Sequence, residues 1–236
     1  MITMRWVVGA VQKSGREWGS WVSSKVRAQQ DAYGWRKRLH AWLMSKSNAR
    51  HERAVAAYKR ELLGQLSGQV VEIGPGGGVN LEYYPRAVHW TGVEPNPYMH
   101  GYLRAKAQGL GLQVDLQSGD AQHLEFSDNS ADAVVSTLVL CSVEDPALAL
   151  REIKRVLRPG GKFVFIEHVA APPGTSTRRR QAWIRPCWKW MGDGCSPDRE
   201  TWKAIEQAGF ESLDLRHFRI PLPIIGPHIA GLAIKS

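Results

Sequence analysis

From residue 69 onward, short apolar runs alternate with longer stretches in which apolar residues recur at helical spacing. This alternation is typical of βαβ units, in which a helix connects two parallel strands. The pattern predicts seven strands, at residues 70–73, 88–93, 114–117, 133–138, 163–167, 213–218 and 229–234. The last two are expected to return antiparallel across a long loop. Five parallel strands with such an ending predict a doubly wound α/β sheet with helices on both faces.

Helical spacing predicts further helices at residues 35–44, 48–66, 146–157 and 197–208. We expect Ser196 to cap the last of these, with Pro197 in its first turn. The run Leu157-Arg158-Pro159-Gly160-Gly161 predicts a turn that ends the preceding helix, because proline and glycine do not continue one.

The first 47 residues differ from the rest and predict a separate helical arm, followed by a domain over residues 48–236. Residues 1–60 hold thirteen Lys or Arg against three Asp or Glu, so the net charge of +9 belongs to this end of the chain. Residues 1–30 form an imperfect amphipathic pattern, and five of the ten tryptophans lie in the arm. Such a segment suits a membrane surface. Nucleic-acid binding and a packed or frayed terminus are the alternatives.

The three cysteines are odd in number and contain no Cys-x-x-Cys pair. A disulfide framework and a zinc cluster are therefore both disfavoured, and we expect no metal and a reducing compartment. No apolar run reaches the ~18 residues of a membrane-spanning helix, and the first residues lack the pattern of a secretory signal.

The strand at 70–73 runs directly into Gly74-Pro75-Gly76-Gly77-Gly78. Glycines permit a tight turn and let a ligand approach the backbone. The dinucleotide fingerprint needs a further glycine where this chain has Val79, and the Gly-Lys of a phosphate-binding loop is missing. What remains is Glu72 followed by alternating glycines, which predicts a nucleoside ligand without a pyrophosphate.

Two more acidic residues follow the next strands. Glu94 comes twenty residues after Gly74, where a carboxylate can accept hydrogen bonds from both ribose hydroxyls. Asp120 can accept from an adenine amino group, or it can simply form a turn. Ligands of open α/β sheets bind at these carboxyl ends of the strands. The residues expected to hold the cofactor are Glu72, Gly74, Pro75, Gly76, Gly78, Asn80, Glu94, Pro95, Asn96, Asp120, Ala121, Thr137 and Leu138.

The order of these motifs resembles the class I S-adenosylmethionine-dependent methyltransferases, whose fold is Rossmann-like with a seven-stranded, mostly parallel sheet. More narrowly, the runs at 136–143, 165–170, 192–195, 199–203 and 226–229 are similar to the microsomal alkyl thiol S-methyltransferases of the methyltransferase-like family. The resemblance covers about residues 45–236. It implies S-adenosylmethionine as cofactor and methyl transfer to the sulfur of small lipophilic thiols. It also implies attachment to the cytosolic face of the endoplasmic reticulum or to lipid droplets through an N-terminal anchor.

In that family the anchor is long and strongly apolar, whereas residues 1–44 of this chain are interrupted by Arg, Lys, Gln and Gly. Peripheral attachment therefore fits the arm better than a membrane span, and a soluble, altered terminus is the alternative.

Methyl transfer from a sulfonium is an in-line displacement, so the enzyme mainly positions the acceptor and excludes water. A thiol pKa near ~8.5 requires only modest assistance, and we expect no catalytic triad. His168 and Asp193 are the candidate catalytic residues, with orienting and turn-forming roles as their alternatives. The segment 178–190 is expected to cover the acceptor, unless it is only a solvated basic helix. The candidate pocket residues are Cys141, Trp183, Trp188 and Cys195.

Three other functions compete with thiol methylation. An enzyme that methylates oxygen or carbon of a quinone-like molecule would have the same cofactor-binding motifs. An RNA methyltransferase would explain the basic arm, but the Asn-Pro-Pro-Tyr-type motif is missing after the fourth strand, where the chain reads Ser-Thr-Leu-Val-Leu. We therefore expect no nucleic-acid partner. A non-catalytic membrane adaptor is the third alternative, and the sequence leaves the oligomeric state open.

Overall fold

The computed structural model describes residues 34–42 and 49–236. Residues 34–42 are helical, in agreement with the helix predicted from residue 35. The rest of the predicted arm, including the amphipathic helix at 1–30, lies outside the described residues. Residues 40–236 form one compact unit, which contains the predicted domain. None of the helices in the described ranges has the length and apolar character needed to cross a bilayer.

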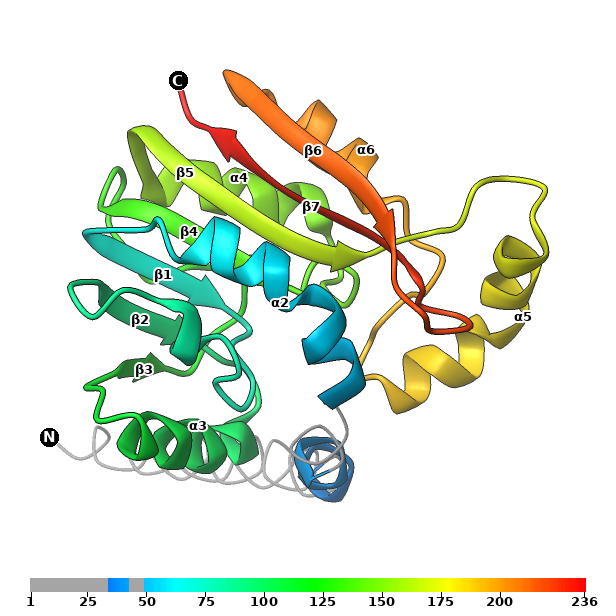
Figure 1. Cartoon of the computed structure of the whole chain (residues 1–236), viewed down its shortest axis with the longest axis horizontal. Coiled ribbons are helices and arrows are strands. Elements are labelled where there is room, and N and C mark those ends of the chain that lie inside the picture. Colours follow the sequence, from blue (N-terminus) through cyan, green and yellow to red (C-terminus); the bar gives the residue numbers. More distant parts are fainter. Residues whose placement is uncertain (1–33, 43–48) are drawn as a thin grey trace, which may run out of the picture. The chain divides into compact units, whose positions relative to one another are not determined.

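Seven strands form one sheet in the order β3-β2-β1-β4-β5-β7-β6 (Figure 1). Strands β1 to β5 are parallel, and β7 runs antiparallel between β5 and β6, as predicted. All but β5 lie within two residues of their predicted bounds. The strands are β1 (Gln69–Ile73), β2 (His89–Val93), β3 (Asp115–Gln117), β4 (Ala131–Thr137), β5 (Leu157–His168), β6 (Ser212–Arg219) and β7 (Pro227–Ile234).

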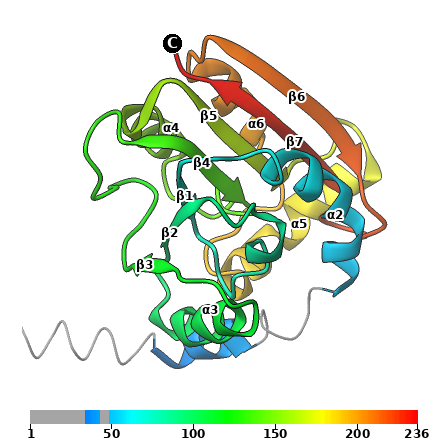
Figure 2. The ribbon, with the colours of Figure 1, turned by 60° about the vertical axis from the view of Figure 1, so that its left-hand side comes forward.

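Helices cover both faces of the sheet (Figure 1, Figure 2). One apolar core packs α2 and α3 against the sheet, and a second packs α4 and α6 against the other face. Neighbouring strand residues serve opposite cores: Val70 belongs to the first and Val71 to the second, because successive side chains point to opposite faces. The strands are therefore apolar on both faces. The helices are α2 (Ala49–Leu63), α3 (Pro97–Gly109), α4 (Pro146–Val156), α5 (Ser176–Met191) and α6 (Thr201–Gln207).

The turn predicted after α4 is part of β5. Ala131 pairs with Leu157 and Ala133 with Lys162, so the residues between Leu157 and Lys162 bulge out opposite Asp132. Gly160 has a φ of 75°, a value that favours glycine. The Asp132 carboxylate accepts from Arg158 at 2.7 Å, which secures the bulge to β4. The predicted turn is therefore a bulge within the strand, and the predicted start of β5 at residue 163 was too late.

The prediction that Ser196 caps a helix starting at Pro197 was wrong. Helix α6 begins only at Thr201, and Glu200 precedes it without a side-chain cap. The backbone N–H of Ser196 instead donates to the carbonyl of Cys141 at 2.9 Å. This bond fixes Ser196 against the loop that follows β4. Residues 196–199 then form a separate turn, in which the N–H of Arg199 donates to the carbonyl of Ser196 at 3.3 Å, before α6 begins.

The Arg- and Trp-rich segment forms α5, which lies beyond the carboxyl ends of β4 and β5 (Figure 1). Its anchor is the buried Gln181, whose amide donates to the carbonyls of Val169 and Ile224 and accepts from the N–H of Ala171. Trp188 follows Gln181 by about two helical turns and lies on the same helix face, whereas Trp183 points away from it. The Trp183 side chain is 85% exposed. The predicted role of Trp183 in a pocket wall is therefore wrong.

Candidate functional site

The carboxylate of Glu94, just after β2, clamps the glycine loop that follows β1. One oxygen accepts from the N–H of Gly76 at 2.9 Å and the other from the N–H of Asn96 at 2.8 Å. Each oxygen keeps capacity for another hydrogen bond. Burial raises the pKa of Glu94, an effect that the two backbone bonds oppose. Gly76 has a φ of 55°, and a Cβ on it would meet nothing within 4 Å, so there is open space beside the loop.

Glu72, in β1, fixes the start of the same loop. Its carboxylate is buried and accepts from the side chains of Asn80 at 2.7 Å, Tyr84 at 2.8 Å and Trp90 at 3.0 Å. Burial raises the pKa of Glu72, while these three donors act in the opposite direction. Because both carboxylate oxygens are used inside the protein, Glu72 stabilises the loop. Its predicted contact with the cofactor stays a prediction.

Asn80 connects this loop to the end of β4, since its amide also donates to the hydroxyl of Thr137 at 3.0 Å. Its Oδ1 atom is buried and has no hydrogen-bond partner among the described residues. Gly74 has a φ of 58°, and a Cβ there would approach a methyl group of Val139 to 2.6 Å. Glycine is therefore required at this position for both conformation and space.

Asp120 lies in a turn after β3, in agreement with the turn-forming role that was the alternative to adenine binding. Its Oδ1 accepts from the N–H of Gln122 at 2.7 Å. Its side chain is 51% exposed, so it retains acceptor capacity toward a ligand. Ala121 beside it is buried. The predicted contact of Asp120 with adenine is not tested by this arrangement.

Glu167, near the end of β5, is an important residue that the sequence analysis missed. Its buried carboxylate accepts from the hydroxyl of Ser136 at 2.6 Å and from the N–H groups of Val139 and Leu140 at 3.1 and 3.2 Å. It thereby holds the loop after β4, in which Leu138 has a φ of 59°. A single acidic residue inside an otherwise apolar strand was the available signal.

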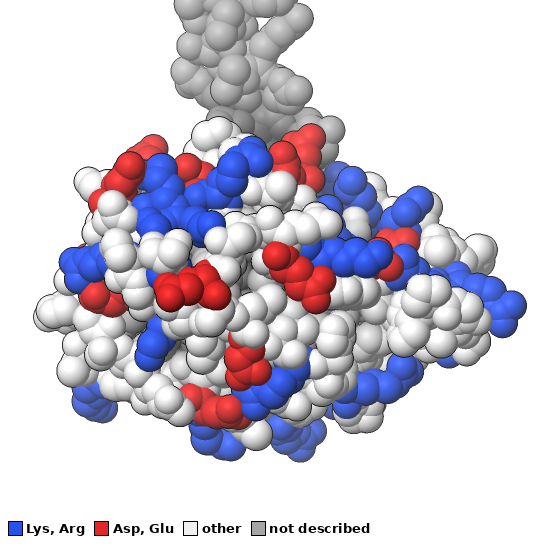
Figure 3. All heavy atoms as spheres, turned by 90° about the horizontal axis from the view of Figure 1, so that it is seen from above, with Lys and Arg blue, Asp and Glu red and all other residues white. Residues whose placement is uncertain are grey.

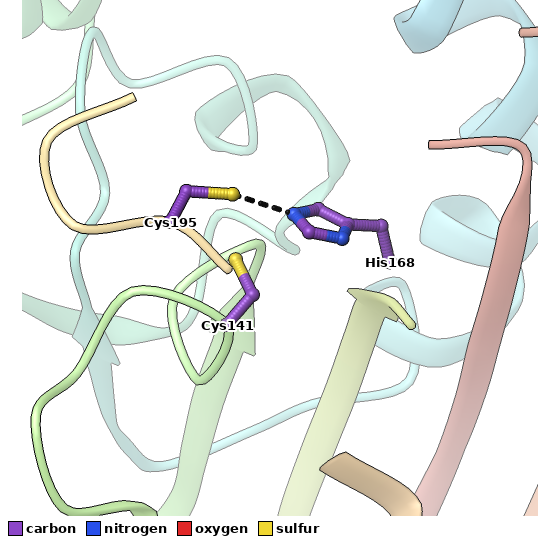
Figure 4. Close-up of side chains that lie close together, drawn as sticks. All are labelled: Cys141, His168 and Cys195. Carbon is purple, nitrogen blue, oxygen red and sulfur yellow. Dashed lines mark hydrogen bonds between the residues drawn. The ribbon is translucent and has the colours of Figure 1, made fainter. Parts of the chain in front are cut away.

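Cys141, His168 and Cys195 come together beside this loop, and we refer to them as the trio. Figure 4 shows the two thiol side chains close to the imidazole, from the loop after β4, the end of β5 and the loop between α5 and α6. The Nε2 atom of His168 lies 2.9 Å from the Sγ atom of Cys195, and the three potential ligand atoms all lie within 4.8 Å of one another. All three residues are buried. The indole N–H of Trp188 donates to the Cys195 sulfur at 3.2 Å.

The contacts within the trio favour a thiolate on Cys195. A hydrogen bond from Cys141 and the bond to His168 lower the pKa of Cys195 to about 4, against the effect of burial. Burial alone would lower the pKa of His168, but its bond to Cys195 and the negative charge there outweigh this effect and raise it. The bond to Cys195, together with burial, raises the pKa of Cys141 well above its ordinary value, so this residue remains a thiol that donates.

The loop that carries Cys195 also approaches the cofactor half of the site. The charge of Asp193 contributes to raising the pKa of Glu94, and Asp193 itself has a φ of 48°. The guanidinium of Arg199 donates to the carbonyls of Leu140 and Val143 at 2.8 and 2.6 Å, which fastens this region to the loop after β4. The predicted cofactor residues and His168 lie at the carboxyl ends of five strands, β1 to β5, which are parallel and end on the same side of the sheet.

Comparisons with known proteins identify relatives of this chain. Residues 71–165 match the methyltransferase domain family. The human thiol S-methyltransferase TMT1B is 38% identical over 215 residues, which cover 84% of this chain and 87% of that protein. The human thiol S-methyltransferase TMT1A is 41% identical over 195 residues, which cover 77% and 80% of the two chains.

Solved structures support the fold alone. A putative methyltransferase from Bacillus halodurans superimposes with a TM-score of 0.62 at 18% identity and covers 78% of this chain and 99% of its own. A geranyl diphosphate methyltransferase in complex with sinefungin gives a TM-score of 0.64 at 15% identity, with 78% of each chain covered. The family expected from the sequence motifs is confirmed. The chain belongs to the family of the thiol S-methyltransferases TMT1A and TMT1B, within the class I S-adenosylmethionine-dependent methyltransferases.

Proposed function

We propose that this protein transfers the methyl group of S-adenosylmethionine to the sulfur of small lipophilic thiols. Its relationship to the thiol S-methyltransferases supports the reaction. The structural observation that carries the proposal is the position of two chemically different groups at one edge of the sheet. One is the Glu94 carboxylate fixed on Gly76, and the other is the trio.

The residues at the glycine loop fit S-adenosylmethionine. Glu94 has spare acceptor capacity on both oxygens for the ribose hydroxyls, and no side chain fills the space beside Gly76. Asp120 is available for the adenine amino group, and the unpartnered Oδ1 of Asn80 lies in the same region. When bound, the cofactor supplies an electrophilic methyl group on a positively charged sulfur.

The trio would assist the acceptor by charge. A thiol reacts as its thiolate, and a positive group next to the sulfur favours that form. The bond to Cys195 raises the pKa of His168, which favours the charged form of the imidazole. Of the two roles predicted for His168, the orienting and stabilising one fits better than that of a free base, since its Nε2 is already bonded to Cys195. Trp188 and the rest of α5 would exclude water from this side.

The experiment is a comparison of acceptors with S-adenosylmethionine labelled in the methyl group. Alkanethiols, phenols and quinones of matched lipophilicity are incubated with the protein, and the products are identified by mass spectrometry. Labelled thioethers from the alkanethiols alone support the proposal. Methylated phenols or quinones without any thioether would favour the oxygen- or carbon-directed alternative.

We further propose that the protein works at a membrane surface. Helix α5 supports this, because Trp183, Trp190 and Met191 are exposed beside the basic residues Arg179 and Arg180. Figure 3 shows Lys and Arg side chains at the end of the molecule where α5 lies, as well as over the rest of this face. Tryptophan with arginine is typical of helices that lie in the headgroup region. Location at the endoplasmic reticulum or lipid droplets stays a prediction from the family.

Sedimentation with vesicles that contain anionic phospholipid tests this second proposal. The full chain is expected to bind, and Trp183→Ala is expected to weaken binding without a change in stability. Equal recovery of the wild type and the variant in the vesicle pellet would show that Trp183 of α5 does not contribute to membrane binding. Absence of the wild type from the pellet would overturn the proposal.

A further inference from the structure

The trio presents two sulfurs and one imidazole nitrogen to a common point. Cysteine and histidine are the side chains that Zn²⁺ prefers in proteins, and three such ligands leave the fourth tetrahedral position open for a water or a substrate. The sequence alone disfavoured a metal because the three cysteines are odd in number and contain no Cys-x-x-Cys pair. The fold removes this objection, because the ends of β4 and β5 and the loop after α5 meet at one place.

The distances suit a tetrahedral ion. Zinc bonds of ~2.3 Å to sulfur and ~2.0 Å to nitrogen place two sulfurs about 3.8 Å apart, and a sulfur and a nitrogen about 3.6 Å apart. The three ligand atoms already lie within 4.8 Å of one another. The His168 and Cys195 atoms, now 2.9 Å apart, would separate by under about 1 Å as the ion replaces the proton between them.

The surroundings also suit a metal-bound thiolate. The indole N–H of Trp188 donates to the Cys195 sulfur, and hydrogen bonds of this kind support metal ligands from outside the coordination sphere. The Nδ1 atom of His168 is buried and has no partner among the described residues, so Nε2 is the nitrogen engaged with the sulfurs. The backbone of the Cys141 loop is fixed by Glu167 and Arg199.

We propose that Cys141, His168 and Cys195 bind one zinc-type divalent cation whose fourth position receives the acceptor thiol. The identity of this fourth ligand rests on the proposed function. As the thiol binds, its S–H bond breaks, a sulfur–metal bond forms, and the proton leaves with the displaced water or hydroxide. Binding of the ion releases two protons, one from the Cys141 thiol and one from the His168–Cys195 pair. Two cysteine thiolates and a neutral histidine then balance the charge of the ion. A third thiolate makes the site negative, and this attracts the positive sulfonium of the cofactor.

Cobalt(II) is the probe, because its tetrahedral thiolate complexes have characteristic visible and near-ultraviolet absorption. The chelator-treated full chain is titrated with Co²⁺ and then with Zn²⁺. We expect one Co²⁺ per chain with a tetrahedral thiolate spectrum that Zn²⁺ abolishes. Cys141→Ser and Cys195→Ser are expected to lose this spectrum. Cys187→Ser, which changes the exposed cysteine on α5, is the matched control and is expected to keep it.

The titration of the wild type shows whether the metal site exists, even where a variant fails to fold. A folded wild type without a tetrahedral thiolate spectrum would overturn the proposal, as would an unchanged spectrum in both trio variants. Addition of an alkanethiol is expected to strengthen the thiolate-to-cobalt absorption, whereas the corresponding alcohol leaves it unchanged. An absorption spectrum that does not change when the thiol is added would overturn the proposal that the thiol binds at the fourth position.

Activity separates this proposal from the proposed function. Thiol methylation at full rate by rigorously metal-free protein would refute a role for the ion in the reaction and leave thiol methylation intact. A normal Co²⁺ spectrum in a protein that methylates no thiol would retain the metal site and reject its assignment to a thiol acceptor.

Discussion

The imidazole of His168 lies 2.9 Å from the sulfur of Cys195, although the two residues are 27 positions apart and come from a strand end and a separate loop. Together with the bond from Trp188, this contact joins α5 and its following loop to the central sheet. A second contact, between Glu94 and Gly76, fixes the glycine loop after β1. We propose that the methyl transfer takes place between these two contacts.

Glu94→Ala is expected to weaken S-adenosylmethionine binding by about 1–3 kcal/mol, because charge-assisted bonds to the ribose and the clamp on Gly76 are both lost. Isothermal titration calorimetry measures the change. Glu206→Ala removes an exposed carboxylate on α6 and serves as the control with unchanged affinity. Wild-type affinity in the Glu94 variant would contradict the ribose assignment.

Cofactor binding is also expected to weaken as the pH falls. Burial raises the pKa of Glu94 above its ordinary value of 4.5, so protonation begins at a higher pH than for an exposed glutamate. The neutral carboxyl group is a poorer acceptor for the ribose hydroxyls. Calorimetry over a pH series should show this loss in the wild type, and Glu94→Gln should bind weakly with a flat profile. An identical pH profile in that variant would assign the titration to another group.

His228 makes the fold sensitive to acid. Its Nε2 atom lies 3.1 Å from that of His51, and burial lowers its pKa from 6.5 to about 3. The unfolded chain therefore binds a proton between these two values that the folded chain does not bind, so the free energy of unfolding decreases as the pH falls from about 6.5 toward 3. Urea denaturation at several pH values measures the slope. His228→Phe should reduce this slope, and a slope as steep as that of the wild type would contradict the assignment.

Glu167→Ala is expected to lower the free energy of unfolding by about 1–3 kcal/mol, because it leaves the N–H groups of Val139 and Leu140 without their acceptor. Glu167→Gln retains an acceptor oxygen and should be less destabilising. Denaturant unfolding of the two variants provides the comparison. Equal stability of the alanine variant and the wild type would show that the loop after β4 does not need this carboxylate.

Most of the fold was predictable, because both faces of the sheet are covered and the strands are therefore continuous apolar runs. The contact between the glycine loop and Glu94 was predictable for a related reason. Each follows a strand, and parallel strands bring their carboxyl ends to the same end of the sheet. The errors have local causes. A separate turn at residues 196–199, fixed to the Cys141 carbonyl, precedes α6 and delays its start. The bulge in β5 was taken as a turn because Pro-Gly-Gly is typical of both.

The trio was not predictable as a unit. Cysteine spacing identifies a cluster only where the ligands are near one another in the chain, and Cys141, His168 and Cys195 come from three separate elements. Trp183 and Trp188 could not be distinguished either, because the register of α5 depends on the burial of Gln181. In both cases contacts between residues far apart in the sequence determine where the side chains lie.

The most direct test of thiol methylation at this site is a crystal structure of the protein with S-adenosylhomocysteine and an alkanethiol. We expect both ribose hydroxyls on Glu94 and the acceptor sulfur between the cofactor sulfur and the trio. A thiol bound elsewhere, or a ribose away from Glu94, would contradict the account.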